Sequence, residues 1–309
     1  MSRSGATLIV QLVVSFTLLA LLLRRFPLHE AAGALAHLKP ATVAAGVALS
    51  LIGYWGRARR WSILLERCGV HLGALASYRL TLVGTFYGIA TPGRVGELAR
   101  VLHVPAPRAA TLSAAVWDRV ADVLLLEVMC VPAFALVPAW RGPLLLAYLG
   151  LVVVTIAGVA CLASPRTMAA AARLVPVLSR PAARWNETSG QLLRSGIGLA
   201  SFGWGAFFYV FMVATAWLLL RDLSPLASPL LLSGLPVIPL LGNLPVALGG
   251  LGLREQVSAA LFTRFGAGAA TGAVFGLSLF IVITLLPSAL GFVASLVRTP
   301  RDAGRVRRP

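Results

Sequence analysis

Six segments of the chain are apolar over about the length that a helix needs to cross a bilayer. A helix rises about 1.5 Å per residue, so roughly 20 apolar residues cross about 30 Å of hydrocarbon. Inside that hydrocarbon every backbone hydrogen bond has to be made within the segment itself, as in a helix. The sequence therefore predicts an all-α, multi-pass membrane protein. The predicted spans are 6–23, 41–56, 116–137, 143–162, 197–220 and 269–297.

The composition excludes an ordinary soluble domain. Hydrophobic residues make up 58% of the chain and charged residues only 12%, against about 25% charged residues in soluble domains. The first apolar segment is followed by Arg24 and Arg25 rather than by a small-residue cleavage site. We therefore expect it to be kept as a span and not removed as a signal peptide.

The charged residues are strongly unbalanced, with 27 basic against 10 acidic residues and a net charge of +17. The basic residues lie between apolar segments, which indicates membrane orientation and contact with anionic lipids rather than nucleic-acid binding. The basic segments 57–79, 164–195 and 298–309 are predicted to face the cytoplasm. The protein is then predicted to lie in the cytoplasmic membrane with both termini on the cytoplasmic side. Arg24, Arg25 and Lys39 would lie outside, as exceptions to the rule that basic residues face the cytoplasm.

Two further apolar stretches, 75–104 and 226–265, are interrupted by prolines and glycines. Such interruptions make a continuous helix costly, and the freed backbone groups have to be satisfied by protein. We predict two re-entrant hairpins that enter from opposite faces, because eight full spans would not keep all three basic segments on one side. Eight spans remain the alternative. The predicted backbone breaks are Pro92, Gly93, Gly96, Gly249, Gly250 and Gly252.

The order helix–hairpin–helix then occurs twice within a single domain, 1–309, that ends in the basic cytoplasmic tail 298–309. The units combine 41–56, 75–104 and 116–137, then 197–220, 226–265 and 269–297. Because one hairpin enters from each face, the arrangement is an inverted repeat, in which transporters place a substrate site near the bilayer midplane.

Arginine and glutamate follow both breaks and form the predicted headgroup site. Arg94 and Arg100 carry the planar guanidinium groups that bind phosphate oxygens, and Glu97 lies three residues from each, where it would orient them. A purely structural clamp of arginine and glutamate is the alternative. In the second hairpin, Arg254 and Glu255 begin the next helix.

A third polar cluster supports this site. Asp118 and Asp122 share one helix face and are expected to pair with hairpin arginines, next to Arg119. Glu127 lies about 15 Å deeper than Trp117. Three roles remain open for Glu127: coupling to protons, lining a polar lipid path, or neutralising an arginine. By contrast, Arg57 to Arg60, beside Trp61, are predicted to be an orientation signal that touches anionic lipid.

Catalytic and metal sites are not predicted. The sequence has no nucleophile motif, P-loop or dinucleotide fingerprint, and its three cysteines and four histidines are dispersed. We therefore expect no enzyme activity and no cofactor.

Three motifs together resemble the flippase-like family, also called the lysylphosphatidylglycerol synthase transmembrane region family. They are Thr91-Pro-Gly-Arg-Val-Gly-Glu-Leu-Ala-Arg, the Asp118-Arg119-x-x-Asp122 helix start and Gly249-Gly-Leu-Gly-Leu-Arg-Glu. The resemblance covers nearly the whole chain. It implies a polytopic fold without enzymatic cofactors. The positions that it carries over are Arg94, Glu97, Arg100, Asp118, Arg119, Asp122, Arg254 and Glu255.

The resemblance also implies a role in lipid handling. The region is linked to movement of aminoacylated phospholipid in the full-length synthase, and other members to hopanoid, polyprenyl-linked glycan and glycolipid pathways. This chain ends at Pro309 without an aminoacyltransferase domain, so we do not expect it to make lysyl-lipid. We expect translocation of an anionic or polyprenyl-linked lipid. The alternative is a membrane-embedded transferase or an accessory subunit of an envelope glycolipid enzyme, with the oligomeric state open.

Overall fold

The computed structural model describes residues 36, 38–89, 91, 94–137, 140–174, 185, 187, 189–190, 197–223, 229–242 and 252–296. All secondary structure in these residues is helical, as predicted. Three helical segments are long and apolar enough to cross a membrane, namely Leu144–Ala163, Ala200–Leu223 and Ala269–Leu296. They agree with three of the predicted spans. The predicted first span, 6–23, and the tail, 298–309, lie outside the described residues.

The other two predicted spans belong to longer helices that contain buried charges. Helix α3 (Pro40–Arg67) continues well past the predicted span 41–56, and α5 (Arg108–Leu136) begins before 116. Both helices bury charged side chains on the faces that pack together. The apolar segments alone therefore underestimate how far these helices extend.

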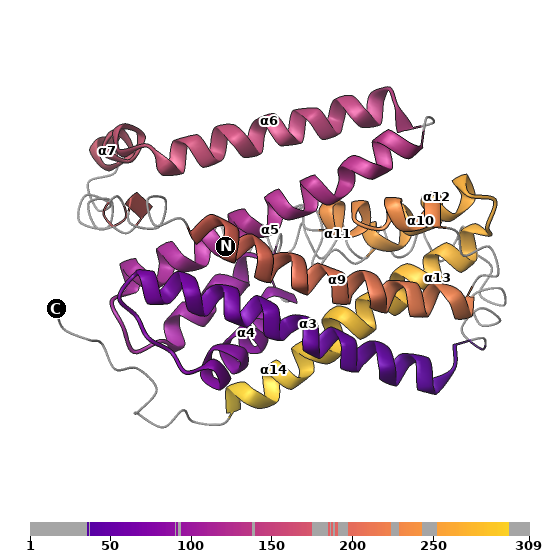
Figure 1. The fold of residues 1–309 in the computed structure, drawn as a ribbon, viewed down its shortest axis with the longest axis horizontal. Coiled ribbons are helices and arrows are strands. Elements are labelled where there is room, and N and C mark those ends of the chain that lie inside the picture. Colours follow the sequence, from indigo (N-terminus) through magenta and orange to yellow (C-terminus); the bar gives the residue numbers. More distant parts are fainter. Residues whose placement is uncertain are drawn as a thin grey trace, which may run out of the picture.

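Helices α3 and α9 (Ile197–Leu223) form the central pair of the bundle (Figure 1). Small residues of α3 allow close packing, since a Cβ atom at Gly56 would lie 2.5 Å from the Phe207 ring. The two helices run antiparallel. Lys39, before the start of α3, lies with its Nζ 3.8 Å from Oδ1 of Asp222, near the end of α9.

The two interrupted stretches fold as pairs of short elements. In the first, α4 (Ala74–Ile89) packs on the 3₁₀ helix η1 (Val95–His103). In the second, α10 (Pro229–Gly234) and α11 (Val237–Gly242) precede α12 (Leu253–Arg264). The α-helix ends at Ile89 before the first predicted break and at Gly242 before the second, and Gly252 precedes α12. Gly96, predicted as a break, lies instead inside η1. The break residues Pro92, Gly93, Gly249 and Gly250 lie outside the described residues.

The last span consists of three joined segments, which accounts for its length. Helix α13 (Ala269–Leu279) continues through a π-helical turn, η4 (Phe280–Leu285), into α14 (Leu286–Leu296). Pro287 lies just after this turn and has no N–H group for the backbone ladder. Wider turns of this kind are frequent at functional sites, and η4 faces the cavity described below.

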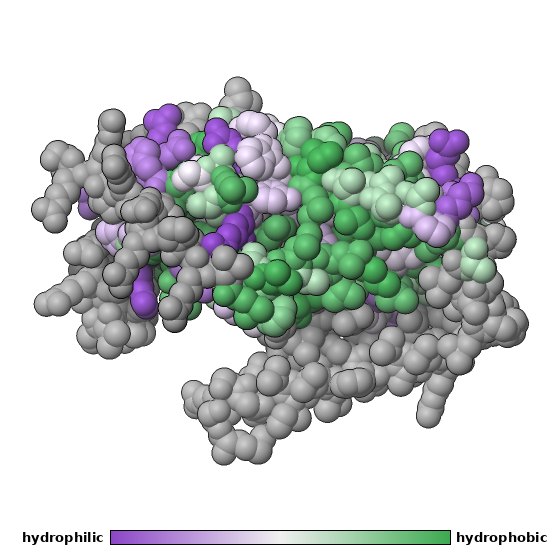
Figure 2. All heavy atoms as spheres, turned by 90° about the horizontal axis from the view of Figure 1, so that it is seen from below, coloured by the Kyte–Doolittle hydropathy of each residue, from purple (hydrophilic) through white to green (hydrophobic). Residues whose placement is uncertain are grey.

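The surface is consistent with a membrane environment. Figure 2 shows a band of apolar side chains between polar groups at the two ends of the long axis. Helices α3, α14 and α6 (Pro143–Ala163), the last followed by α7 (Pro165–Leu174), all end at the same end of the molecule (Figure 1). Helix α3 ends within the basic segment 57–79, α6 leads into 164–195, and α14 ends just before 298–309. The described residues next to the three basic segments therefore lie at one end of the molecule.

Candidate functional site

A buried network of arginines and carboxylates joins α3, η1 and α5. Nη2 of Arg57 lies 2.5 Å from Oε2 of Glu97 and 2.6 Å from Oδ2 of Asp122. Arg60 donates from Nε to Oδ1 of Asp118 and from Nη2 to Oδ1 of Asp122, at 2.6 Å in both cases. All of these side chains are at most 5% exposed. Because removing charges from water is costly, such a cluster is stable only when each charge is paired.

The hairpin residues extend this network. Nη2 of Arg100 lies 2.5 Å from Oδ2 of Asp118, and its guanidinium carbon lies 4.2 Å from the centre of the Trp61 ring. Nε of Arg94 lies 2.8 Å from Oε1 of Glu97. The pairing of Asp118 with a hairpin arginine therefore agrees with the prediction. Of the two arginines that Glu97 was predicted to orient, it contacts Arg94 and not Arg100, which binds Asp118 instead.

The hairpin backbone determines where Arg94 lies. The N–H group of Gly96 donates to Oγ1 of Thr91 at 2.6 Å, which closes the turn between α4 and η1. A Cβ atom at Gly96 would collide with the carbonyl oxygen of Tyr87, so this position requires glycine. Arg94 itself has a φ angle of +56°, in the left-handed region that side chains other than glycine rarely adopt. Strained backbone of this kind clusters at ligand sites.

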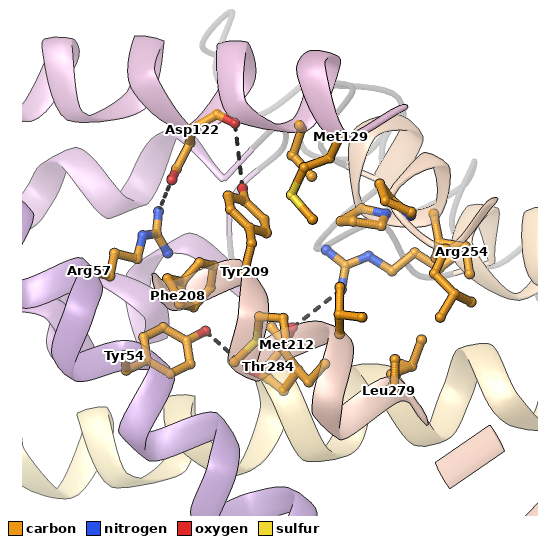
Figure 3. Close-up of a pocket in the computed structure, with 18 of the residues that line it drawn as sticks. Tyr54, Arg57, Asp122, Met129, Phe208, Tyr209, Met212, Arg254, Leu279 and Thr284 are labelled. Atoms are coloured by element: carbon orange, nitrogen blue, oxygen red, sulfur yellow. Dashed lines mark hydrogen bonds and ion pairs between the residues drawn. The ribbon is translucent and has the colours of Figure 1, made fainter. Parts of the chain in front are cut away.

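An open cavity lies next to the network (Figure 3), and its empty space, which includes the solvent at its mouth, is about 820 Å³. Its charged lining consists of four arginines and one carboxylate: Arg57, Arg94, Arg119, Arg254 and Asp122. The remaining walls are aromatic or aliphatic for the most part and include Tyr54, Phe208, Tyr209, Leu126, Met129, Met212, Leu235, Pro236, Ile238, Pro239, Leu279 and Ile283. The cavity thus combines an excess of positive charge with apolar walls.

Arg254 enters this cavity from the side opposite Arg57 (Figure 3). It is only 6% exposed, and its Nη1 donates to Oγ1 of Thr284 at 3.3 Å. No carboxylate lies within ion-pair distance of Arg254 in the described part of the chain. The absent side chain of Gly242 makes room for Arg254, since a Cβ atom there would lie 2.5 Å from Nε.

Two tyrosines connect the cavity wall to the helix backbones. The Tyr54 hydroxyl donates to the carbonyl oxygen of Ile283 at 3.0 Å. Pro287, four residues further along, has no N–H group to donate to that oxygen, so the oxygen is available to Tyr54. The Tyr209 hydroxyl donates to the carbonyl oxygen of Asp122 at 3.5 Å. These bonds connect α3, α5, α9 and η4 around the cavity.

The predicted site residues divide into two groups. Arg94, Arg119, Asp122 and Arg254 line the cavity, whereas Arg100 and Asp118 lie behind it within the network. Glu255 accepts the N–H group of Gly252 at 2.7 Å and so caps its own helix, where Gly252 has a φ angle of +81°.

Two sequence-based assignments need correction. Asp122 binds Arg57 and Arg60 of α3, as well as Arg119, rather than a hairpin arginine. Arg57 and Arg60 are buried members of the network and not lipid-facing orientation signals. Arg57 and Arg60 are three residues apart on the continuation of an apolar helix. This spacing is the sequence signal from which a shared buried face could have been predicted.

Glu127 is buried separately from this network. Its Oε1 accepts a hydrogen bond from Oγ1 of Thr155 on α6 at 2.6 Å. No arginine lies within ion-pair distance of it among the described residues, so these do not support a role in neutralising an arginine. The described residues also contain no group of three or more metal-ligating side chains.

The comparison with known families agrees with this architecture. The model of the lysylphosphatidylglycerol synthase TM region family matches residues 8–291. The chain belongs to this family. No curated protein and no solved structure matched the chain. Membership connects this membrane protein with lipid or envelope glycolipid biology, and the match covers most of the chain.

Proposed function

We propose that this protein binds the anionic headgroup of a membrane lipid in the arginine-lined cavity and moves that lipid across the cytoplasmic membrane. The observation that carries the proposal is the lining of the cavity, in which four arginines and one aspartate meet apolar walls. An anionic headgroup would balance the charge, and its hydrocarbon would contact the walls.

Several arginine N–H groups at the cavity support the binding of an anion. Nη2 of Arg94, Nε of Arg57 and Nε of Arg254 are buried without a hydrogen-bond partner among the described residues. A buried donor without a partner costs about 1–3 kcal/mol. Phosphate oxygens accept two hydrogen bonds from one guanidinium group and would remove this cost.

The apolar side of the cavity favours a lipid over a small soluble anion. Met129 and Met212 face each other across the cavity with Leu279 nearby (Figure 3). Methionine side chains are flexible and adapt to irregular apolar ligands. Arg57 lies ten residues before the end of α3, about 15 Å along the helix, so a headgroup has to leave the interface to reach it.

The helix arrangement supports alternating access. Helices α3 and α9 begin the two proposed repeat units and run antiparallel, as an inverted repeat requires. In this proposal the two interrupted segments are re-entrant hairpins between six spans, and the end of the molecule with the basic segments faces the cytoplasm. Arg94 and Arg254 then come from opposite hairpins and share one cavity.

The network argues against a transferase reaction by the same carboxylates. Glu97, Asp118 and Asp122 each lie within ion-pair distance of two or three arginines. A general base needs a lone pair that is available to the substrate, whereas the oxygens of these carboxylates already contact arginines. We therefore assign these groups to positioning the arginines and propose no catalytic role.

Transport in liposomes tests the proposal. Purified protein is reconstituted with phosphatidylglycerol or phosphatidic acid labelled on an acyl chain, and protection of each lipid from a membrane-impermeant quencher is measured for wild type, Arg94→Gln and Arg264→Gln. Arg264 is exposed at the end of α12 and is the matched control. We expect labelled lipid to cross with wild type and the control, and at least tenfold more slowly with Arg94→Gln. Equal rates in folded Arg94→Gln protein, or no movement by wild type, would overturn the proposal.

A further inference from the structure

The balance of charges at the site indicates which headgroup charge would fit the cavity. The network, the cavity and the adjoining cap of α12 together contain six arginines and four carboxylates among the described residues. These are Arg57, Arg60, Arg94, Arg100, Arg119, Arg254, Glu97, Asp118, Asp122 and Glu255. Two positive charges are therefore not balanced by protein carboxylates.

The position of the unbalanced charge follows from the pairings. Asp118 and Asp122 are occupied by Arg60, Arg100 and Arg57 within the buried network. Among the described residues, Arg94 has one carboxylate within ion-pair distance, Glu97, which it shares with two other arginines. In the same part of the chain Arg254 donates to the Thr284 hydroxyl and lies over the Phe280 ring, with no carboxylate within ion-pair distance. The two least compensated arginines are thus the ones that enter the cavity from the two hairpins.

We infer that the cavity selects a lipid whose headgroup carries two negative charges and no cation, that is, a phosphate monoester or a diphosphate. A phosphate monoester carries about −1.5 to −2 at pH 7, whereas the phosphodiester of an ordinary phospholipid carries −1. The inference rests on the proposed function, since it presupposes that an anionic headgroup occupies this cavity.

The same contacts disfavour an aminoacylated headgroup. A lysyl group adds positive charge, and its ammonium groups need a carboxylate with free acceptor capacity. Asp122, the carboxylate in the cavity wall, already lies within ion-pair distance of Arg57, Arg60 and Arg119. A cationic headgroup would therefore meet unbalanced arginines in the described part of the wall, and like charges repel strongly where water is excluded.

Binding measurements with lipids of different charge test this inference. Protein in a neutral detergent is titrated at pH 8 with dioleoyl phosphatidic acid, dioleoyl phosphatidylglycerol and lysylphosphatidylglycerol, and affinity is measured by native mass spectrometry. We expect phosphatidic acid to bind at least about tenfold more tightly than phosphatidylglycerol, and lysylphosphatidylglycerol to bind most weakly. Equal affinity for the first two lipids would overturn the charge selectivity and leave the proposed function standing. If no anionic lipid binds, the proposed function fails as well.

The pH dependence separates charge from headgroup shape. A phosphate monoester has its second pKa near 6, so lowering the pH from 8 to 5.5 removes most of its second charge. The titratable side chains of the described cavity wall are arginines, Asp122, Tyr54 and Tyr209, and Glu97 and Glu255 adjoin it. These types ordinarily titrate outside this interval. We expect the preference for phosphatidic acid to be largely lost at pH 5.5. A preference unchanged by pH would contradict the inference.

Variants identify the arginine responsible. In Arg254→Gln one unbalanced charge is lost, and the preference at pH 8 should fall at least about fivefold, whereas Arg254→Lys and the exposed control Arg264→Gln should retain most of it. Inorganic phosphate distinguishes a lipid from a soluble anion as the ligand. It should compete only at millimolar concentration. Phosphate binding as tight as that of phosphatidic acid, or a full preference in folded Arg254→Gln protein, would overturn the assignment.

Discussion

Arg57 of α3 and Asp122 of α5 form a buried ion pair in which Nη2 lies 2.6 Å from Oδ2 and both side chains are at most 4% exposed. The pair joins α3 and α5 inside the bundle. It also places one guanidinium group in the cavity wall. If the cavity binds a lipid as proposed, stability and ligand binding depend on the same contact.

Loss of Asp122 should destabilise the bundle. Asp122→Ala leaves Arg57, Arg60 and Arg119 with reduced compensation, and breaking a buried pair costs about 3–5 kcal/mol. The free energy of unfolding in SDS titrations measures this loss. Glu187→Ala, which removes an exposed carboxylate, should cost less than about 0.5 kcal/mol. Similar losses for both variants would show that the network contributes little to stability.

The turn before η1 should not accept a side chain at Gly96. Gly96→Ala brings Cβ onto the Tyr87 carbonyl oxygen, and overpacking of this kind costs about 1–3 kcal/mol. We expect a lower unfolding free energy and weaker lipid binding, because Arg94 moves with the turn. Gly150→Ala in α6 meets no atom within 4 Å and should leave both unchanged or slightly improved. Binding by Gly96→Ala at wild-type strength would contradict this role of the turn.

The bond from Tyr54 to the π-helical turn should depend on Pro287. Tyr54→Phe removes the hydrogen bond to the Ile283 carbonyl oxygen, at a cost of about 0.5–1.5 kcal/mol. In a Pro287→Ala background a backbone N–H group competes for that oxygen, so the cost of Tyr54→Phe should be smaller. A double-mutant cycle in SDS unfolding measures the difference. An unchanged cost would mean that Pro287 does not control access to the oxygen.

Gly242 should act on binding through Arg254. Gly242→Ala places Cβ 2.5 Å from Nε of Arg254 and displaces a flexible side chain rather than backbone. We therefore expect anionic-lipid affinity to fall about tenfold, equivalent to about 1.4 kcal/mol, with little change in the unfolding midpoint. If affinity falls only in step with stability, Gly242 has a structural role alone.

Much of the architecture could be predicted from the periodicity and length of apolar segments. The three helical segments with few charges, ending at Ala163, Leu223 and Leu296, agree with predicted spans. The helices that carry Arg57 and Asp118 were harder to delimit, because hydropathy falls where a charge is buried against another charge. Local sequence does not show whether an arginine at a helix end meets lipid, water or a carboxylate.

The candidate site was predictable in its residue types but only in part in its pairings. Glycine breaks followed by arginine and glutamate indicated Arg94 and Arg254, which both line the cavity. Glu255 was expected to contact a headgroup, and in the structure its Oε2 caps α12. Arg57 was missed as a site residue, since its partners Glu97 and Asp122 lie 40 and 65 positions away.

The sequence alone determined that this protein is helical and membrane-embedded, because the apolar segments and the scarcity of charge leave no other solvent for its surface. It also determined where the helices break, because proline and glycine act locally. Only the tertiary structure decided which charges neutralise one another and which arginines line the cavity. An ion pair requires atoms within about 4 Å, and that proximity is set by the packing of α3, η1, α5 and α12 rather than by spacing along the chain.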